Sequence, residues 1–255
     1  MPAAEPRPAV LVTGHCGGLG RALVACFEGA GYVVLGLDAR AEEADGPNAS
    51  YRRFDLLEAA GSDEALERVS AGVRRRLAET DARLTCLVNN AAVQILGSLE
   101  ELSLGDISRS FLVNAVAPMT LTKTFLDLLT ESRGSVVNIG SIHASLTKPR
   151  FAAYAASKSA LRGITQALSQ DIGDAVRVNV VEPAAVDTEM LRDGFAGDEG
   201  ALTELRNYHP SRRILLPEEV AELVLFLASD RCHGLNGAVI PVDGAIGNAL
   251  HDPGR

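Results

Sequence analysis

Short, nearly all-apolar runs alternate along the chain with longer amphipathic segments. The runs cover residues 9–13, 33–38, 84–89, 135–139, 176–181 and 238–242, and a shorter strand is expected from Tyr51 to Asp55. Runs without polar alternation are typical of strands covered on both faces, as in a parallel sheet. Apolar spacing predicts helices at about 18–29, 62–80, 103–130, 152–172 and 217–228. This strand–helix alternation predicts a doubly wound α/β fold with a central parallel sheet of about seven strands and helices on both faces.

The 255 residues are expected to form one domain, because no linker, repeat or low-complexity segment interrupts the pattern. One segment breaks the alternation late in the chain. Residues 189–216 are rich in Gly, Asp, Glu and Arg, which predicts a mobile loop or lid.

Charge and cysteine usage exclude several classes of partner. The chain carries 24 basic and 33 acidic residues, a net charge of −9, which disfavours nucleic acid and anionic membranes. None of the four cysteines stands in a C-x-x-C pair or at zinc-ligand spacing, so reduced thiols in a cytoplasmic protein are expected, without a metal site. The amino-terminal residues do not resemble a secretory signal, and no apolar run approaches the roughly 20 residues of a membrane span.

A glycine-rich turn follows the first strand. It reads Thr13-Gly-His-Cys-Gly-Gly-Leu-Gly20, with the spacing T-G-x-x-x-G-x-G, and a predicted helix begins at once. Glycines let the backbone turn tightly and approach a pyrophosphate, which the positive end of the helix attracts. The position between a strand and a helix makes a dinucleotide site the favoured interpretation.

The second strand ends in Asp38, 20 residues after Gly18. A carboxylate there can accept hydrogen bonds from the adenosine ribose and would repel a 2′-phosphate, so NAD is favoured over NADP. Arg40 lies two residues further on. It is interpreted as a solvated surface arginine, but it leaves NADP use open.

A second group of residues carries a family resemblance. Tyr154 and Lys158 form Y-x-x-x-K, one helical turn apart; Ser141 precedes Tyr154 by 13 residues, and Asn114 precedes Ser141 by 27. Their order and spacing, together with the glycine turn and Asn89-Asn-Ala-Ala92, resemble the short-chain dehydrogenase/reductase family over nearly the whole chain.

The resemblance implies a single Rossmann domain, with a cofactor half at about 1–135 and a catalytic and substrate half at about 136–255. It implies NAD-dependent interconversion of a secondary alcohol and a ketone. Tyr154 would be the general acid/base, Lys158 would lower the Tyr154 pKa and bind the ribose, Ser141 would position the substrate oxygen, and Asn114 would hold a relayed water.

The resemblance also implies a set of cofactor contacts. Besides Tyr154 and Lys158 these are Gly14, Cys16, Gly18, Leu19, Gly20, Asp38, Asp55, Leu56, Asn90, Ala91, Ala92, Val113, Pro183, Val186 and Thr188. The family usually has glycine where Ala92, Ala184 and Ala245 stand. These changes are expected to narrow the cofactor pocket or to restrict the nearby backbone.

The substrate is less constrained. Gln94, His143, Lys148 and Arg150 stand near the catalytic segments, and Gln94 with Ser141-Ile-His143 is similar to the pattern of 3-hydroxybutyrate dehydrogenases. The basic residue expected just before the tyrosine is displaced, however. A hydroxy acid, a polyol or sugar, a cyclic alcohol and a polyketide-type ketone all remain open. Glu182 either places a charge near the site or points outward.

Two alternatives compete with an NAD-dependent enzyme: an NADP-dependent ketoreductase, and a non-catalytic dinucleotide-sensing protein of the same fold. The four intact catalytic positions favour the enzyme.

The resemblance further implies a homo-oligomer, a tetramer or a dimer, formed through the helices that bear Asn114 and Tyr154 and through the last strand. The tail from Ala249 to Arg255 could reach a neighbouring subunit.

Overall fold

A computed structural model describes residues 5–40, 51–195 and 197–249. These residues form one sheet of seven parallel strands in the order β3-β2-β1-β4-β5-β6-β7. The strands are β1 (Arg7–Thr13), β2 (Val33–Asp38), β3 (Tyr51–Arg53), β4 (Ala82–Asn89), β5 (Ser135–Ile139), β6 (Arg177–Pro183) and β7 (Val239–Val242).

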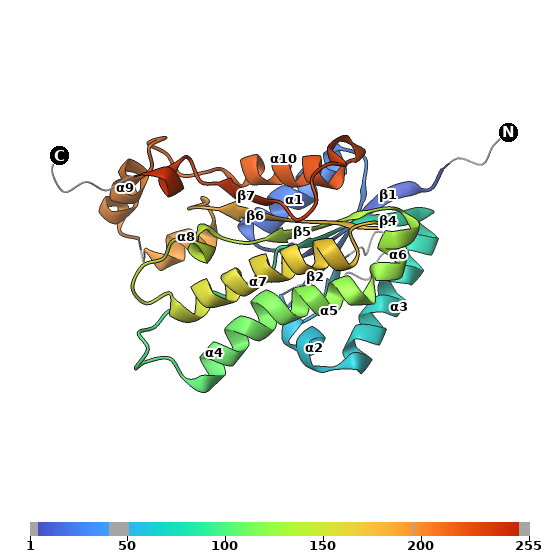
Figure 1. Cartoon of the computed structure of the whole chain (residues 1–255), viewed down its shortest axis with the longest axis horizontal. Helices are drawn as coiled ribbons and strands as arrows, with labels where there is room; N and C mark the ends of the chain where they lie inside the picture. Colours follow the sequence, from blue (N-terminus) through green and yellow to red (C-terminus); the bar gives the residue numbers. More distant parts are fainter. Residues whose placement is uncertain (1–4, 41–50, 196, 250–255) are drawn as a thin grey trace.

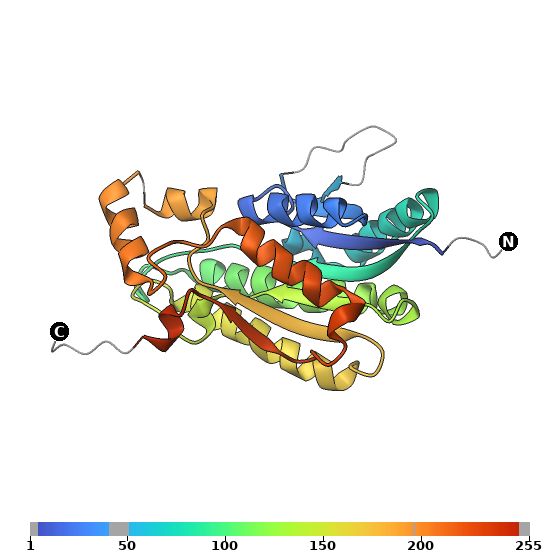
Figure 2. The ribbon, with the colours of Figure 1, turned by 90° about the horizontal axis from the view of Figure 1, so that it is seen from above.

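Helices cover both faces of the sheet (Figure 1). The helices α1 (Gly18–Gly29) and α10 (Pro217–Ala228) pack against each other on one face, as the view from above shows (Figure 2). The other face carries α2 (Leu56–Gly61), α3 (Asp63–Glu79), α4 (Leu104–Phe111), α5 (Ala117–Thr124), α6 (Leu126–Glu131) and α7 (Ala152–Asp171). The described residues also include three-residue 3₁₀ turns, which are η2 (Ile142–Ala144), η3 (Asp230–Cys232) and η4 (Ile246–Asn248).

The two covered faces explain the all-apolar strands. Successive side chains of a strand point to opposite faces. On β1, Ala9 and Leu11 enter one core cluster, whereas Val10 and Val12 enter the other, on the α1 and α10 side. Apolar side chains are therefore favoured on both faces of such a strand, which confirms the prediction of a doubly wound parallel sheet.

Three details differ from the sequence prediction. The predicted helix 103–130 is divided. A π-helical turn, η1 (Leu112–Val116), lies between α4 and α5, and the helix is interrupted again at Phe125, between α5 and α6. The third strand ends at Arg53 instead of continuing to Asp55. Asp55 caps the short helix α2, which the apolar spacing did not indicate.

The segment 189–216, for which the composition predicted a mobile loop or lid, holds two short helices. It contains α8 (Glu189–Gly194) and α9 (Glu199–Tyr208), which lie at the end of the molecule opposite to the start of β1 (Figure 1). Thr188 and Asp198 cap these helices with their side chains, and Leu202 anchors α9 by burial. The composition obscured both helices because each is short. Movement of this segment stays a prediction.

The sheet order places a crevice at the ends of β1 and β4. The connection after β1 passes to one face of the sheet, and the connection after β4 passes to the other. In open α/β sheets, ligands bind outside the carboxyl ends of the strands at such a switch point.

None of the described helices is both long and apolar enough to cross a bilayer. The predicted contact of the tail beyond Ala249 falls outside the described residues.

Candidate active and cofactor-binding site

The glycine turn between β1 and α1 has no room for larger side chains. Gly14 adopts φ +69°, in the left-handed region, and a Cβ there would lie 2.8 Å from Ala91 Cα. A Cβ on Gly20 would lie 2.0 Å from the Gly14 carbonyl oxygen. Gly17 caps α1 without a side-chain hydrogen bond, and the first turn of the helix holds no acidic residue. The helix therefore presents open backbone amides, which fit the pyrophosphate of a dinucleotide.

Asn90 fixes this turn from the neighbouring strand end. Its Nδ2 donates to the carbonyl oxygens of Thr13 at 2.9 Å and Gly14 at 3.1 Å. The Thr13 hydroxyl accepts from the amides of Asn90 and Ala91, both at 3.0 Å. The segment after β4 thus lies directly beside the glycine turn, as the predicted cofactor roles of Asn90 and Ala91 require.

Asp38 lies at the end of β2, where its side chain is only 7% exposed. Its carboxylate accepts hydrogen bonds from the amide of Cys16 at 3.0 Å and the amide of Arg40 at 2.8 Å. The Arg40 guanidinium is 63% exposed, and its Nε lies 3.6 Å from Asp38 Oδ1. Arg40 is thus solvated, as predicted, but it also pairs with the carboxylate whose charge is the argument against a 2′-phosphate.

The other predicted cofactor residues divide into two groups. Leu56 and Val113 are buried in the core, and Asp55 accepts from the Leu57 amide at 3.0 Å as the cap of α2. Pro183 is buried at the end of β6, and half-buried positions are occupied by Leu19, Ala92, Val186 and Thr188. A Cβ on Gly18 would lie 3.0 Å from Thr188 Cβ, so the segment after β6 also reaches the glycine turn.

The predicted catalytic side chains meet between α7 and the end of β5. Tyr154 and Lys158 lie on α7, and the Lys158 ammonium is 5.9 Å from the centre of the Tyr154 ring. The Ser141 hydroxyl hydrogen-bonds the Tyr154 phenol, and both side chains are buried. Lys158 is 2% exposed and donates to the Ile139 carbonyl at 2.7 Å.

Burial dominates the ionisation of this group. It raises the pKa of Tyr154, and the hydrogen bond from Ser141 partly opposes that rise. Burial lowers the pKa of Lys158 to about 8, against the attraction of Glu182. Ser141 is therefore the neighbour that favours the phenolate in the protein alone. The predicted effect of Lys158 on the Tyr154 pKa stays a prediction for the cofactor-bound enzyme.

Asn114 lies in the π-helical turn η1, a feature often found at functional sites. Its Oδ1 accepts from the Val93 amide at 2.8 Å, and its Nδ2 donates to the Val93 carbonyl at 2.9 Å and to Ser157 Oγ at 3.0 Å. Both amide hydrogens are thus used by the protein. A water in the predicted relay would have to be held by an oxygen of Asn114.

Among the substrate candidates, His143 contacts the Tyr154 ring. His143 stacks on Phe151 with ring centres 4.3 Å apart and meets the Tyr154 ring edge-on at 5.9 Å. Burial, with a smaller effect of Lys148, lowers the pKa of His143 to about 4, so the imidazole is neutral at pH 7. Arg150 is exposed and pairs with Glu101 at 2.8 Å. Gln94 is half-buried in the segment after β4.

Comparison with known proteins identifies the family to which this chain belongs. A family model described as enoyl-(acyl carrier protein) reductase matches residues 14–246. D-threitol dehydrogenase from Mycolicibacterium smegmatis is 32% identical over 251 residues, covering 92% of this chain and 90% of that protein. The chain belongs to the short-chain dehydrogenase/reductase family.

Solved structures of this family show the same fold. Ligand-free aldohexose dehydrogenase from Thermoplasma acidophilum is 30% identical, with a TM-score of 0.85 over 97% of this chain and 98% of that one. A proposed NAD(P)-dependent gluconate 5-dehydrogenase from Beutenbergia cavernae, with NADP at low occupancy, is also 30% identical, with a TM-score of 0.81 over 95% and 97%. The chain is thus a short-chain oxidoreductase of CH–OH groups with an NAD(P)-binding fold.

One buried ion pair in this dehydrogenase/reductase was not predicted. Glu182, at the end of β6, is 3% exposed and accepts from Arg162 Nε at 2.7 Å and Nη2 at 2.5 Å. Arg162 also hydrogen-bonds Ser145, just after η2. The sequence showed that Glu182 ends a buried strand, but Arg162 had no signal because its partner is 20 residues away on another element.

The Lys158 pKa gives a prediction for the cofactor-free protein. Its folded value of about 8 lies below the unfolded value of about 10.4, so the cost of folding with a charged lysine is complete below pH 8 and declines above it. We expect wild type to gain about 1 kcal/mol over Lys158→Met between pH 7 and pH 9. Denaturant unfolding of both proteins at each pH measures the difference; parallel pH profiles would contradict it.

Proposed function

We propose that this protein is an NAD-dependent dehydrogenase that interconverts a secondary alcohol and a ketone, with Tyr154 as general acid/base. The observation that carries the proposal is the meeting of Tyr154, Lys158 and Ser141 at the same end of the sheet as the glycine turn. The parallel strands bring the glycine turn and the catalytic residues to one end of the sheet, although 128 positions separate Gly14 from Ile142, which directly follows Ser141.

The chain's own residues supply the proton chemistry. The bound nicotinamide accepts or supplies the hydride. Ser141 would hydrogen-bond the substrate oxygen together with Tyr154. The Tyr154 phenolate would take the alcohol proton during oxidation, and the resulting phenol would return a proton during reduction. Lys158 binds the ribose and favours the phenolate through its charge. Asn114 connects this group to the segment after β4 and holds the relayed water.

The preference for NAD rests on Asp38. Its buried carboxylate faces the start of α1, where it would accept hydrogen bonds from the ribose hydroxyls. Arg40 is the observation that favours the alternative, an NADP-dependent reductase, because its guanidinium lies beside that carboxylate and could turn toward a phosphate.

A neutral hydroxylated substrate suits the walls of this site best. His143 is uncharged at pH 7, so it can hydrogen-bond a hydroxyl group but cannot pair with a carboxylate. Arg150 is already paired with Glu101. Relatives named for threitol and aldohexoses support a polyol or sugar as the first substrates to test.

The test is a matrix of substrates and cofactors. Purified protein is mixed with NAD or NADP and a panel of polyols, sugars, hydroxy acids and cyclic alcohols, and the absorbance of the reduced cofactor is followed. Reduction of NAD by a polyol or sugar is the expected result. Turnover with NADP alone would overturn the cofactor assignment. NAD binding without turnover of any panel member would favour the sensing protein.

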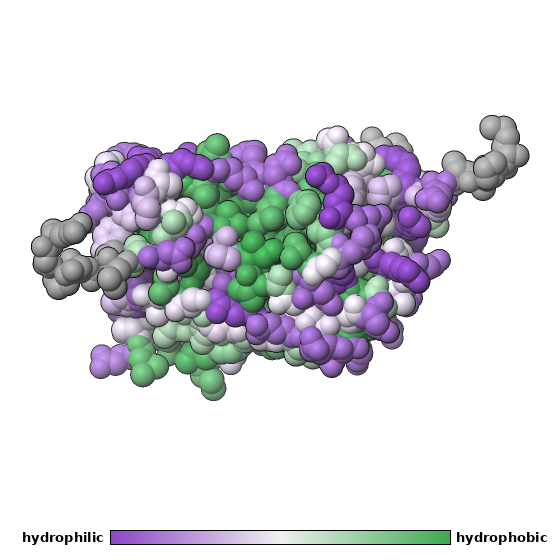
Figure 3. Space-filling model, turned by 45° about the horizontal axis from the view of Figure 1, so that its top comes forward, coloured by the Kyte–Doolittle hydropathy of each residue, from purple (hydrophilic) through white to green (hydrophobic). Residues whose placement is uncertain are grey.

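We also propose that the protein is a cytoplasmic homo-oligomer. All four cysteines are free thiols, as in reducing compartments. The strand β7 forms one edge of the sheet, and β7 and α10 carry half-buried apolar side chains, among them Ile240 and Phe226. Figure 3 shows apolar side chains gathered on this side of the molecule. An apolar sheet edge is usually covered, and a second copy of the chain would cover it.

A further inference from the structure

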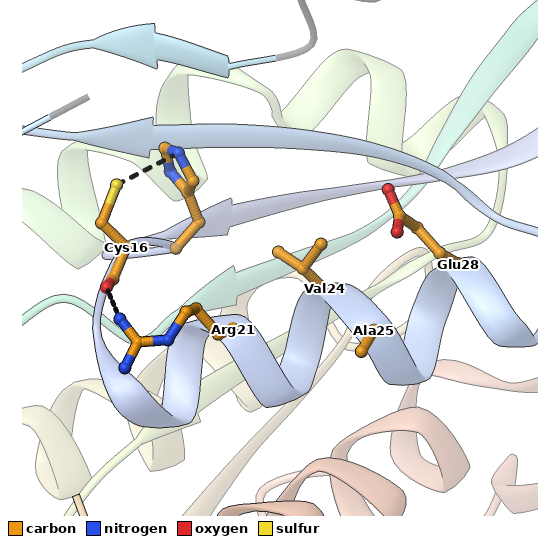
Figure 4. A pocket seen from close by; sticks show the side chains of 6 residues that line it. Cys16, Arg21, Val24, Ala25 and Glu28 are labelled. Atoms are coloured by element: carbon orange, nitrogen blue, oxygen red, sulfur yellow. Dashed lines mark hydrogen bonds between the residues drawn. The ribbon is translucent and has the colours of Figure 1, made fainter. Parts of the chain in front are cut away.

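Three possible metal ligands meet beside the glycine turn. His15 and Cys16 belong to the turn itself, and Asp38 comes from the end of β2. Their ligand atoms all lie within 4.8 Å of one another. His15 Nε2 is 3.5 Å from Cys16 Sγ, the contact drawn from Cys16 in Figure 4. Imidazole, thiolate and carboxylate are the three side-chain ligands that zinc uses in proteins.

The separation of nitrogen and sulfur matches a tetrahedral zinc site. Zn–S bonds of about 2.3 Å and Zn–N bonds of about 2.0–2.1 Å, at a tetrahedral angle, place the two ligand atoms about 3.5 Å apart. The observed distance between His15 Nε2 and Cys16 Sγ is 3.5 Å. These two ligands therefore need no change in spacing, whereas the Asp38 carboxylate must approach by a rotation of its side chain.

The surroundings suit a cation. His15 and Asp38 are both buried, and Cys16 is half-buried at the start of a cleft of about 450 Å³ beside α1, lined also by Arg21, Val24, Ala25 and Glu28. Asp38 retains carboxylate lone pairs beyond the two that accept amides.

Two cationic side chains near the cluster, those of Arg40 and Arg21, are exposed and can therefore move away from it. Arg40 lies 3.6 Å from Asp38 and is mostly exposed. Arg21 is exposed and donates to the Cys16 carbonyl at 2.6 Å (Figure 4), and it also pairs with Glu189 at 2.7 Å. The net charge of −9 favours a divalent cation over the whole molecule.

We propose that His15, Cys16 and Asp38 bind one Zn²⁺ ion, and that the bound ion excludes the dinucleotide. On binding, the Cys16 thiol loses its proton to solvent, a zinc–thiolate bond forms, and water completes the fourth position. Asp38 is then no longer available to a ribose, and the ion occupies the turn over which the pyrophosphate would pass. The exclusion rests on the proposed cofactor site, whereas zinc binding itself does not.

Spacing along the chain did not reveal this cluster. The cysteines of the chain have no zinc-type spacing, because the third ligand of the cluster, Asp38, lies at the end of β2, 22 residues after Cys16. The expectation of no metal site followed from that spacing alone.

The first test measures binding to the cofactor-free protein. ZnCl₂ is titrated by calorimetry, and CoCl₂ is added in parallel to detect the thiolate-to-cobalt absorption band. We expect one site per chain in wild type and loss of at least tenfold in affinity, with no thiolate band, in Cys16→Ser and His15→Gln. Cys26→Ser, on α1 and outside the cluster, is the matched control and should bind zinc like wild type. Unchanged binding in Cys16→Ser would overturn the site.

The second test measures competition. NADH binding is followed by its fluorescence at increasing free Zn²⁺, and EDTA is then added. The apparent Kd for NADH should rise in proportion to zinc and return with EDTA in wild type and Cys26→Ser, but should not depend on zinc in His15→Gln. NADH affinity unaffected by saturating zinc would refute the exclusion. If neither NADH nor NADPH binds zinc-free protein, the proposed function fails together with the exclusion, while the first test still decides the zinc site.

Discussion

Tyr154→Phe is expected to lower turnover by about 10²- to 10⁴-fold while leaving NADH binding nearly unchanged. The substitution removes only the phenolic hydroxyl, which is the group that exchanges a proton with the substrate. The ring keeps its edge-on contacts with His143 and Phe151, whose centres lie 5.9 and 6.2 Å away, so the packing of α7 should survive. Initial rates with the best substrate of the panel and NADH fluorescence titration measure the two effects.

A second tyrosine provides the matched control. Tyr32 is half-buried, meets Phe27 edge-on at 5.0 Å and precedes β2, at the opposite end of the sheet from the site. Tyr32→Phe removes the same atom without touching the crevice, and it should retain the wild-type rate. Comparable rates in wild type and Tyr154→Phe would show that another group transfers the proton.

The features that the sequence predicted are those that depend on strand burial and on order along the chain. The all-apolar runs predicted the parallel sheet because both faces of each strand are covered. The grouping of Ser141, Tyr154 and Lys158 was implied by the resemblance to the short-chain dehydrogenase/reductase family, and in the structure these residues lie on α7 and directly after β5. The sheet therefore followed from periodicity, whereas the site followed from the resemblance of its motifs.

Features that depend on contacts between distant segments were not predictable. The π-helical turn at Asn114 interrupts a segment whose apolar spacing is that of one helix, and only the Val93 backbone explains where the amide must point. The Arg162–Glu182 pair and the cluster of His15, Cys16 and Asp38 likewise join residues from different elements. Nothing in local composition marks such pairs.

One departure from the family pattern has a visible structural effect. Ala245 stands where relatives usually have glycine, and its φ of +68° lies in the left-handed region that glycine adopts more easily. The Asp243 carboxylate accepts from the amides of Ala245 and Gly247 at 2.9 and 3.0 Å, which holds this turn in place. The expectation that alanine restricts the backbone therefore has a physical basis here.

The largest effect on stability is expected from Arg162→Met. This change leaves the Glu182 carboxylate, whose side chain is 4% exposed, without its cation. Breaking a buried pair by removing one partner costs about 3–5 kcal/mol, and the 26% exposure of the Arg162 side chain places the expected loss near the lower value, about 3 kcal/mol. For a chain of this size the melting temperature should fall by roughly 6–12 °C, measured by calorimetry or circular dichroism.

The double variant Arg162→Met/Glu182→Gln separates the lost pair from the stranded charge. Glutamine keeps the shape of Glu182 but needs no counterion, so the double variant should be more stable than Arg162→Met alone. Both variants lose the bond from Arg162 to Ser145, which follows the turn bearing Ser141, so both should lose turnover to a similar degree. Equal melting temperatures for the single and double variants would mean that the Glu182 carboxylate is not destabilising without Arg162, which would contradict the stranded-charge explanation.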